Sequence, residues 1–580
     1  MRTRFLALLI PVLSFATGID PDPRDPPSRK HEALGEYLTA AAAYGYSGVV
    51  LVADRDGVIL ERGYGFADRA QRQRNDPSIA FDLGSLSKMF TAAAILTLVY
   101  NGSLRLTDSL AHIFPDTPVD KRAITVAQLI AHTSGLRLPY GARAVLTRDE
   151  PRQRIMRAPL RFAHGSRTEY SNAGYVILAA IVQQVSGESF TAYVTRRLFA
   201  KAGMTRTGFR GALPATLDGA VAHGYDELGE LVDPARWDAG NTAWLGAEGA
   251  VSTASDLRRW FDELRGGRIM PLERAQTLLT PLEPDSAGGG YAFGLRVDRT
   301  TSNQTVIAQS GDPDGYGSRL AWYPEHGVLL VSLCNIRHDL YPTHTVVEDA
   351  LERLLLGAEI ESPPAPRQVA ATTTLSGVFQ LDDGSTFIVD TAQGELRLGA
   401  IGQRAIDVLA GGDSAARAAR AQLTRRTSEL LSAWKRGDTM PMSEALGRGG
   451  DAADFGRAMA EEMLMRTDHH EVTDMEVVGT YPGGGPYGVQ STLVRLHSAG
   501  VSATYRIKWL DGIIWDSGPR APATAAELIL QPIGTRRWVG WDLIHPAHIE
   551  ATLAAGTGGA DTLTVINRTA HTAAVAQRGH

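Results

Sequence analysis

The sequence has almost no cysteine: Cys334 is the single thiol in 580 residues. One cysteine excludes an intrachain disulfide, so burial of apolar side chains has to hold the fold together. Apolar residues make up 44% of the chain, which is ample for globular cores. Cys334 itself ends an apolar run at residues 327–334, and this run predicts a buried strand.

The chain also lacks a strong charge imbalance and a long apolar run. A net charge of −6 indicates no broad basic face, which excludes nucleic acid as a partner. The apolar run Phe5–Ala16, interrupted by Pro11 and Ser14, is too short for a membrane span, which needs about 20 apolar residues. Because basic residues precede this run, residues 1–18 are predicted to be a signal peptide. The protein is therefore expected to be exported, periplasmic or extracellular, with no stable membrane span after cleavage; a retained anchor is the alternative.

The most informative chemical pattern is Ser85-Leu86-Ser87-Lys88, at the start of an apolar, Ala-rich helical run. Positions three apart lie on one helix face, with Cβ atoms roughly 5–6 Å apart, so the Lys88 amine can reach the Ser85 hydroxyl. A serine nucleophile needs a neighbouring base, and a partly desolvated lysine can be that base. Gly84 allows a sharp turn into the helix, whose free N–H groups would surround Ser85. Alone, the pattern is weak, because most such pairs are solvated helix surface.

A second polar pattern is Tyr170-Ser171-Asn172, which follows a Gly-containing turn and precedes a predicted helix. A tyrosine phenol can shuttle a proton if a nearby ammonium lowers its pKa. An asparagine amide both donates and accepts, so Asn172 can hold a substrate amide and a lysine together. The alternative is a helix N-cap formed by Ser171 or Asn172, and both interpretations can hold at once.

These two patterns and their surroundings resemble the serine β-lactamase and penicillin-binding protein superfamily. The similarity is greatest to its branch of class C β-lactamases, D-aminopeptidases, D-Ala-D-Ala carboxypeptidases and esterases. It covers about residues 30–359. The matching segments are Phe81–Ala92, Gly102–Asp108, Ile124–Leu136, Tyr170–Asn172, Ala202–Thr207 and Gly246–Leu257. Each segment is short, but their joint order and spacing argue against chance agreement.

The resemblance implies an α/β fold, with a central antiparallel sheet flanked by helices and an all-helical subdomain. It also implies acyl transfer without a metal or an organic cofactor. Ser85 would attack the carbonyl, and Lys88 and Tyr170 would take its proton and later protonate the leaving group. Asn172 would orient the substrate amide. The backbone N–H groups of Ser85 and Asp312 would hold the oxyanion, and such donors commonly contribute about 10²–10³ in rate each.

The family has a third element, Lys-Thr-Gly or His-x-Gly, and this chain departs from it with Gln309-Ser310-Gly311. Glutamine carries no charge, whereas lysine or protonated histidine there can attract a substrate carboxylate. Charge-assisted hydrogen bonds are roughly twice as strong as neutral ones, so we expect weaker capture of carboxylate-bearing β-lactams. Arg319, just downstream, is a candidate for the missing charge. The alternative is a degenerate, slow or inactive site.

Several histidines are expected to have no catalytic role. His132 lies in a family signature segment, and a supporting role beneath the site is favoured over catalysis by about three to one. His469 and His470 are adjacent, which does not suit metal ligation on one helix face, and further His, Cys or carboxylate side chains are not arranged around them as ligands. We therefore expect no metal site.

The length predicts more than one domain. A helix at residues 345–356 is expected to close the first domain, and the Pro-rich residues 360–370 read as a linker. Residues 371–412 alternate apolar and polar side chains between turns, which predicts a small β-meander. Residues 413–580 are predicted to form an α+β accessory domain, with helices at 415–434 and 451–465 followed by strands. It loosely resembles a nuclear-transport-factor-like or cystatin-like cone, and a structural or oligomerising role is favoured over a substrate-gating or wall-binding role.

The sequence as a whole predicts a serine hydrolase that acts through an acyl-enzyme. The expected substrates are small molecules or peptides, namely D-residue peptides, small amides or esters, with β-lactams a lesser expectation. The alternative is a non-catalytic or slow receptor of the penicillin-binding type that keeps the fold. Lys88 and Tyr170 favour the enzyme, whereas Gln309 favours the receptor. The sequence does not indicate an oligomeric state.

Overall fold

The structure is a computed structural model that describes most of the chain from residue 27 onward. The described ranges are 27–139, 145–147, 149–226, 229–238, 240–271, 276–282, 284, 289–300, 302–337, 343–365, 375–392, 395–446, 472–482, 489–498, 501–518, 524–542, 547–555 and 561–578. The predictions of a signal peptide at residues 1–18, of a helix at 451–465 and of inert histidines at 469 and 470 lie outside the described residues. Among the described helices, none combines the length and apolar character that a membrane crossing requires.

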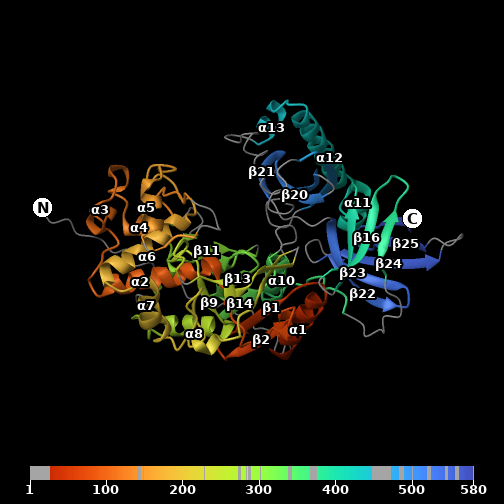
Figure 1. Cartoon of the computed structure of the whole chain (residues 1–580). Coiled ribbons are helices and arrows are strands. Elements are labelled where there is room, and N and C mark those ends of the chain that lie inside the picture. The colour runs from red at the N-terminus through yellow and green to blue at the C-terminus, as the bar shows by residue number, and fades with distance from the viewer. Residues whose placement is uncertain are drawn as a thin grey trace.

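A seven-stranded antiparallel sheet forms the centre of the N-terminal part (Figure 1). In spatial order its strands are β10 (Gly290–Tyr291), β11 (Arg296–Arg299), β12 (Thr305–Gly311), β13 (Gly317–Tyr323), β14 (Val328–Cys334), β1 (Gly48–Ala53) and β2 (Val58–Tyr64). β1 and β2 pair as a hairpin around Gly57. Cys334 is buried at the end of β14, as its apolar run predicts.

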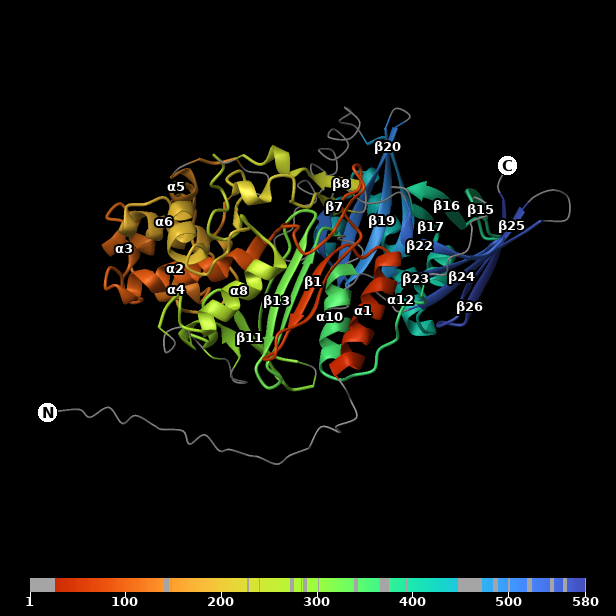
Figure 2. The ribbon, with the colours of Figure 1, turned by 90° about the horizontal axis from the view of Figure 1, so that it is seen from below.

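Both faces of this sheet are covered, which is why β1 is apolar throughout. On β1, Val50 and Val52 pack with α1 (Pro27–Ala43) and α10 (Thr343–Leu355), which lie side by side in Figure 2. Val49 and Leu51 point the other way, toward α8 (Ala254–Arg265) and the helical subdomain. The sheet with its two helical layers confirms the predicted α/β class.

The helical subdomain lies between β5 and β6 in the sequence. Its helices are α2 (Lys88–Tyr100), α3 (Leu110–Ile113), α4 (Val126–Ile130), α5 (Glu150–Arg157), α6 (Asn172–Ser186) and α7 (Phe190–Val194), which continues as a π-helical turn, Thr195–Phe199. Single turns of 3-10 helix stand at Gly84–Ser87 (η1), Val119–Lys121, Ala215–Leu217, Pro234–Arg236 and Gln276–Leu279. α2 contacts α6, and its small Ala92, Ala93 and Ala94 are fully buried there, so the Ala-rich run forms a central helix rather than a surface one.

Short strands connect the subdomain to the sheet. They are β3 (Phe66–Asp68) with β4 (Gln73–Arg74), β7 (Gly224–Asp226) with β8 (Gly229–Val232), and the three-stranded set β5 (Phe81–Asp82), β9 (Ala250–Ser252) and β6 (Gly208–Phe209). β9 lies between β5 and β6, so residues near 82, 210 and 250 meet although they are far apart in the sequence.

Beyond the linker, eight strands close into a barrel. In order around the barrel they are β15 (Gly377–Gln380), β16 (Thr386–Ala392), β17 (Glu395–Ile401), β22 (Ala525–Gly534), β23 (Arg537–Asp542), β24 (Ala547–Ala555), β25 (Asp561–Asn567) and β26 (Thr572–Arg578). The boundary predicted between a meander at 371–412 and a domain at 413–580 is therefore wrong. The meander's strands bond to strands from the chain end, β17 to β22 and β15 to β26, because closing the barrel leaves no unpaired edge.

The α+β unit is inserted between β17 and β22. It contains α12 (Ser414–Lys435), α13 (Met440–Ala445) and a four-stranded sheet of β18 (Asp474–Pro482), β19 (Gln490–Ser498), β20 (Val501–Leu510) and β21 (Ile513–Gly518). The helix predicted at 415–434 and the presence of strands after it are confirmed. Figure 1 shows the unit rising beside the barrel, with α11 (Gln403–Ala410) between them.

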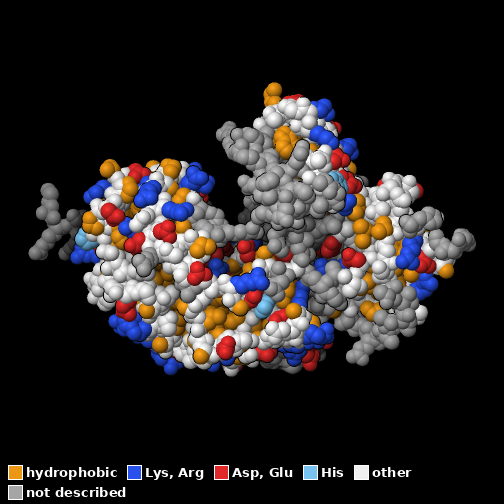
Figure 3. Space-filling model, viewed as in Figure 1, with side chains coloured by type: hydrophobic (Ala, Val, Ile, Leu, Met, Phe, Trp, Pro, Cys, Tyr) orange, Lys and Arg blue, Asp and Glu red, His pale blue; other side chains and the backbone are white. Residues whose placement is uncertain are grey.

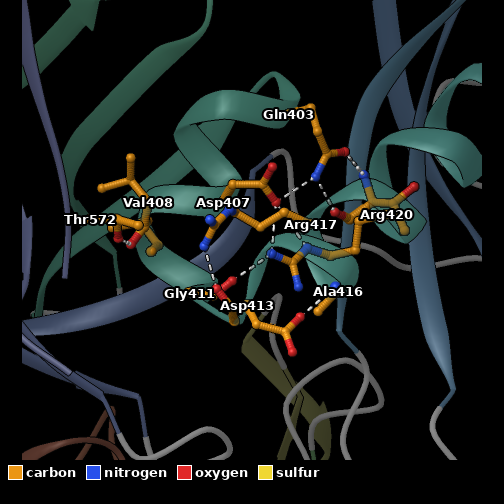
Figure 4. Close-up of polar contacts among 12 residues, drawn as sticks. Gln403, Asp407, Val408, Gly411, Asp413, Ala416, Arg417, Arg420 and Thr572 are labelled. Atoms are coloured by element: carbon orange, nitrogen blue, oxygen red, sulfur yellow. Dashed lines mark hydrogen bonds and ion pairs between the residues drawn. The ribbon is translucent and has the colours of Figure 1, made fainter. Parts of the chain in front are cut away.

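A polar network joins the barrel to the inserted unit (Figure 4). Arg420 on α12 donates to Asp407 Oδ1 at 2.9 Å and to the Gly411 carbonyl at 2.6 Å. Gln403 donates to the same Asp407 oxygen at 3.0 Å and to the Thr480 carbonyl of β18 at 2.9 Å. Since Arg420 is only 2% exposed, this ion pair is part of the core of the junction.

Candidate active site

Ser85 lies in η1, at the entry to α2, where the chain turns sharply. Gly84 before it has φ +47°, and a Cβ on Gly84 would come within 2.6 Å of Pro313 Cδ. Both the left-handed backbone and the close approach require glycine. The Gly84 N–H donates to Asp82 Oδ1 at 2.9 Å, which fixes the start of the turn. The predicted position of Ser85 at a helix entrance, with glycine before it, is what the structure shows.

Lys88 starts α2 and points back to Ser85, with its Nζ 2.9 Å from Ser85 Oγ. It also donates to the Ala247 carbonyl at 3.0 Å, and the side chain is 1% exposed. Burial lowers the pKa of Lys88 to about 7, and the nearby Glu248 carboxylate opposes that change. A large fraction of Lys88 is therefore the neutral amine near neutral pH, the form that can accept the Ser85 proton.

Tyr170 approaches Ser85 from the helical subdomain, and its hydroxyl donates to Ser85 Oγ at 2.8 Å. The Lys88 ammonium lies 4.9 Å from the centre of the Tyr170 ring. One edge of the ring faces solvent, but protein crowds the hydroxyl, and this burial raises the pKa of Tyr170 well above its ordinary value. The expectation that a neighbouring ammonium lowers this pKa is wrong, because burial outweighs the hydrogen bonds with Ser85 and Gln309 that would lower it. Tyr170 is thus a phenol that can donate a proton, and Lys88 is the better base.

His132 holds Tyr170 in place. The Ser171 N–H donates to His132 Nδ1 at 2.9 Å, and the ring of His132 lies 4.6 Å from that of Tyr170. Burial, and then the charge of Lys88, lower the pKa of His132 to about 3, so it is neutral. A neutral ring that accepts a backbone bond beneath the tyrosine has the supporting role that the sequence predicts for His132.

Asn172 is the first residue of α6, and Ser171 is the N-cap, with its Oγ accepting from the Gly174 N–H at 3.3 Å. Asn172 Oδ1 is buried and has no hydrogen-bond partner among the described residues. It borders a cavity of about 380 Å³ that Tyr170 and Arg137 also line. This oxygen can accept an N–H from a ligand. Within the described chain, no hydrogen bond joins Asn172 to Lys88, so the expected link between them is not formed in this state.

The third element lies at the end of β12, directly beside Ser85. A Cβ on Gly311 would lie 2.1 Å from the Leu83 carbonyl oxygen and 2.8 Å from the Ser85 nitrogen, so only glycine fits. Gln309 Nε2 donates to the Ser85 carbonyl at 3.4 Å, and its side chain also hydrogen-bonds to Tyr170. Ser310, between Gln309 and Gly311 in the sequence, is exposed. The predicted third element is thus brought to the nucleophile, with an uncharged amide at its first position.

Arg319 does not supply the missing charge. Its guanidinium donates to Glu352 on α10 at 3.1 Å. The preceding Ser318 donates to the Leu83 carbonyl at 2.8 Å, on the Ser85 side of the sheet. Neighbouring strand residues point to opposite faces, so Arg319 faces α10.

Asp312 follows Gly311 and borders a second cavity, of about 550 Å³. Arg210 and Glu248 also line this cavity, with their charged groups 3.6 Å apart. Arg210 further contacts the buried carboxylate of Asp82. On the face of the molecule shown in Figure 3, acidic and basic side chains are interspersed, and no charge of one sign dominates it.

Three residues of this arrangement were not predicted: Asp82, Arg210 and Glu248. Glu248 lies inside the matching segment Gly246–Leu257, but its approach to Lys88 depends on β9 lying beside β5 and β6. Arg210 stands in no motif. Among the described residues, no group of three or more His, Cys, Asp or Glu side chains has an arrangement that could hold a metal ion.

The described geometry places a nucleophile, a base of lowered pKa and a phenolic proton donor within one hydrogen-bonded cluster. The backbone N–H of Ser85 belongs to the first turn of η1 and α2, where partial positive charge gathers. An unpaired amide oxygen at Asn172 stands at the edge of the cluster. This arrangement is suited to attack on a carbonyl group and to stabilisation of the charge that develops on its oxygen.

Comparison with known proteins gives a consistent result. The model of the Beta-lactamase family matches residues 34–352. A penicillin-binding protein of Bacillus subtilis is 26% identical over 417 residues, which are 66% of this chain and 89% of that protein. Protein flp of Staphylococcus aureus is 25% identical over 313 residues, 50% of this chain and 60% of flp. The octameric penicillin-binding protein homologue of Pyrococcus abyssi is 18% identical, covers 95% of this chain and 99% of its own, and has a TM-score of 0.49.

Proposed function

We propose that this chain, which belongs to the Beta-lactamase family, is a serine hydrolase that acts through an acyl-enzyme on amides or esters. The observation that carries the proposal is the contact of Ser85 Oγ with both Lys88 Nζ, at 2.9 Å, and the Tyr170 hydroxyl, at 2.8 Å. Burial keeps Lys88 available as a neutral amine and keeps Tyr170 protonated. Base and acid are thus assigned by their environments.

The reaction begins when neutral Lys88 takes the Ser85 proton and Oγ forms a bond to the substrate carbonyl carbon. The carbonyl oxygen becomes an oxyanion, which the backbone N–H groups of Ser85 and Asp312 stabilise. As the carbonyl re-forms, the bond to the leaving group breaks, Tyr170 gives that group its proton, and Lys88 then passes the proton taken from Ser85 to Tyr170. Water then takes the place of Ser85 as the nucleophile, and Ser85 takes the place of the leaving group. This second acyl transfer releases the acid and free Ser85.

The uncharged Gln309 supports a substrate without a carboxylate next to the scissile bond. Its amide bonds to the Ser85 carbonyl and to Tyr170, so it is already used within the site. Arg319, the sequence-based candidate for the missing positive charge, is paired with Glu352 on α10. Small amides, esters and peptides with D-residues therefore fit the site better than carboxylate-bearing β-lactams. An exported protein, as the basic and apolar first residues predict, would meet such peptides outside the cytoplasm.

The second candidate is a receptor of the penicillin-binding type that is acylated and turns over slowly or not at all. Gln309 favours it, because a neutral first position weakens recruitment of charged substrates. Lys88 and Tyr170 favour the hydrolase, because repeated turnover needs a base and an acid in deacylation as well as in acylation.

Labelling with a fluorescent fluorophosphonate and a fluorescent penicillin tests both candidates. We expect the fluorophosphonate to label the intact chain and not Ser85→Ala, with Ser87→Ala as the matched serine control that keeps its label. Once labelling has been established, turnover of nitrophenyl esters and D-alanyl amides by the unlabelled chain separates a hydrolase from a receptor. Equal labelling of Ser85→Ala and the intact chain would refute the assignment of the nucleophile. Stable label with no multiple turnover would favour the receptor.

A further inference from the structure

His344, the second residue of α10, contacts the residue that carries the second oxyanion donor. Its Nε2 lies 2.8 Å from Asp312 Oδ1, and its side chain is 8% exposed. The ring lies against the start of β13, where a Cβ on Gly317 would come within 2.5 Å of His344 Cδ2. The absence of a side chain at Gly317 therefore makes room for this ring.

The backbone at Asp312 needs a support of this kind. The ladder between β12 and β13 ends at the pair Gly311–Ser318, so strand pairing no longer sets the orientation of Asp312. Pro313 follows and restricts Asp312 to extended conformations, but it does not fix the direction of the N–H to the accuracy that catalysis needs. A side-chain anchor on Asp312 fixes that direction.

Charged groups from three elements face His344. They are Asp312 after β12, Glu348 one turn further along α10, and Arg337 after β14. Burial of the ring disfavours the imidazolium, and Arg337 opposes it too, but Asp312 and Glu348 outweigh both and raise the pKa of His344. Glu348 is itself 5% exposed, and its Oε1 has no hydrogen-bond partner among the described residues. The bond between His344 and Asp312 is therefore charge-assisted when the imidazole is protonated.

We propose that His344 is a positioning residue for the acyl transfer, and that its bond to Asp312 holds the Asp312 N–H toward the substrate carbonyl oxygen. This inference rests on the proposed function, since the oxyanion forms only if Ser85 attacks a carbonyl. His344 does not touch the reacting atoms. It acts from the α10 side of the sheet, through the carboxylate of Asp312.

Two substitutions separate positioning from packing. His344→Phe keeps a ring against Gly317 and removes the N–H, whereas His344→Gln keeps a donor that can reach Asp312. We expect kcat for a nitrophenyl ester to fall about tenfold in His344→Phe with KM changed less than about twofold, because the donor acts in the transition state. In His344→Gln, kcat should return to within about threefold of the original value. His112→Phe, at an exposed histidine, is the matched control and should leave both constants unchanged.

The pH profile gives a readout that a merely structural role would not move. Above the raised pKa of His344 the charge-assisted bond becomes a neutral one, so kcat of the intact chain should decline by a few-fold on the alkaline side. His344→Gln has no titrating group there and should lose that decline. Unchanged kcat in His344→Phe would overturn the inference. An equal loss of kcat in His344→Phe and His344→Gln, with lowered melting temperatures, would overturn it as well. In both cases labelling of Ser85 would leave the proposed function standing. Failure of the intact chain to react with fluorophosphonate would overturn both.

Discussion

The pH dependence of acylation is the most direct consequence of the burial of Lys88. At 1% exposure, desolvation lowers the Lys88 pKa from 10.5 to about 7. The active form is the neutral amine, so activity is gained as the pH rises through this pKa. The neutral fraction is about a tenth at pH 6 and about nine-tenths at pH 8, so kcat/KM should rise roughly tenfold between them, before the few-fold alkaline decline expected from His344. An unperturbed lysine would give a tenfold rise per pH unit that continues to about pH 10.

Glu248 provides a second perturbation with a defined sign. Its carboxylate raises the Lys88 pKa against the effect of burial. Glu248→Gln removes this charge and keeps the shape, so the Lys88 pKa should fall further and the acidic limb should move to lower pH. At pH 6 the variant should therefore be faster than the intact chain. Glu325→Gln, in the exposed turn between β13 and β14, is the matched control and should leave the profile in place.

The assay is single-turnover reaction with an uncharged nitrophenyl ester from pH 5.5 to 9.5, with the hydrolysis of the ester by buffer subtracted. Lys88→Arg keeps a cation that cannot deprotonate, and it should lose about 10²–10⁴ in rate at every pH. A profile that continues to rise past pH 9, or an acidic limb that moves to higher pH in Glu248→Gln, would refute the reasoning. The first result would show that burial does not lower the pKa of the base, and the second that Glu248 does not raise it.

Three further outcomes are expected. Gly311→Ala should lower kcat/KM at least about 10²-fold, because its Cβ would overlap the Leu83 carbonyl and push β12 from Ser85, whereas Gly35→Ala in α1, with open space around it, should be neutral. Gln309→Lys should raise kcat/KM for a carboxylate-bearing cephalosporin about tenfold relative to a neutral ester, and an equal change for both substrates would contradict the charge argument. Arg420→Ala should lower the free energy of unfolding by about 3–5 kcal/mol in urea titrations, against less than about 1 kcal/mol for the exposed Arg404→Ala.

The parts of the site that depend on local spacing could be predicted from the sequence. Ser85 and Lys88 are three residues apart, and η1 followed by α2 keeps such residues on one face. Ser171 is followed by a regular helix, so its role as the N-cap could be predicted as well. The resemblance of short segments then placed Tyr170 and Gln309 near Ser85, which no periodicity in the sequence would have done.

The electrostatic details could not be predicted in the same way. Whether Tyr170 has a raised or a lowered pKa depends on the balance between burial of its hydroxyl and its hydrogen bonds with Ser85 and Gln309, and only the packed structure gives that balance. The face on which Arg319 lies depends on strand register. Arg210 meets Asp82 and Glu248 because β9 lies between β5 and β6, an arrangement that no single segment encodes.

The C-terminal barrel shows the same limit on a larger scale. Residues 377–401 alternate as a meander does, and they form the strands β15, β16 and β17. Their partners, however, come from beyond residue 524. Alternation specifies which face of a strand is buried but not which distant strand covers its edge. The sequence of a meander that is interrupted by an α+β insertion therefore predicts two domains, although the strands on both sides of the insertion belong to one barrel.

The position of the barrel argues for a supporting role in the reaction. Every residue assigned to the site lies between Asp82 and His344, and none comes from the barrel or the inserted unit. The barrel instead contacts α1: Val539 and Trp541 share a buried cluster with Leu34 and Leu38, and Gln531 donates to the Ala43 carbonyl at 2.6 Å. α1 packs on α10, which carries His344. The C-terminal part thus buries the outer side of the layer formed by α1 and α10, and α10 holds the Asp312 segment. Removal of the C-terminal part would expose this layer to water without removing any group that touches substrate.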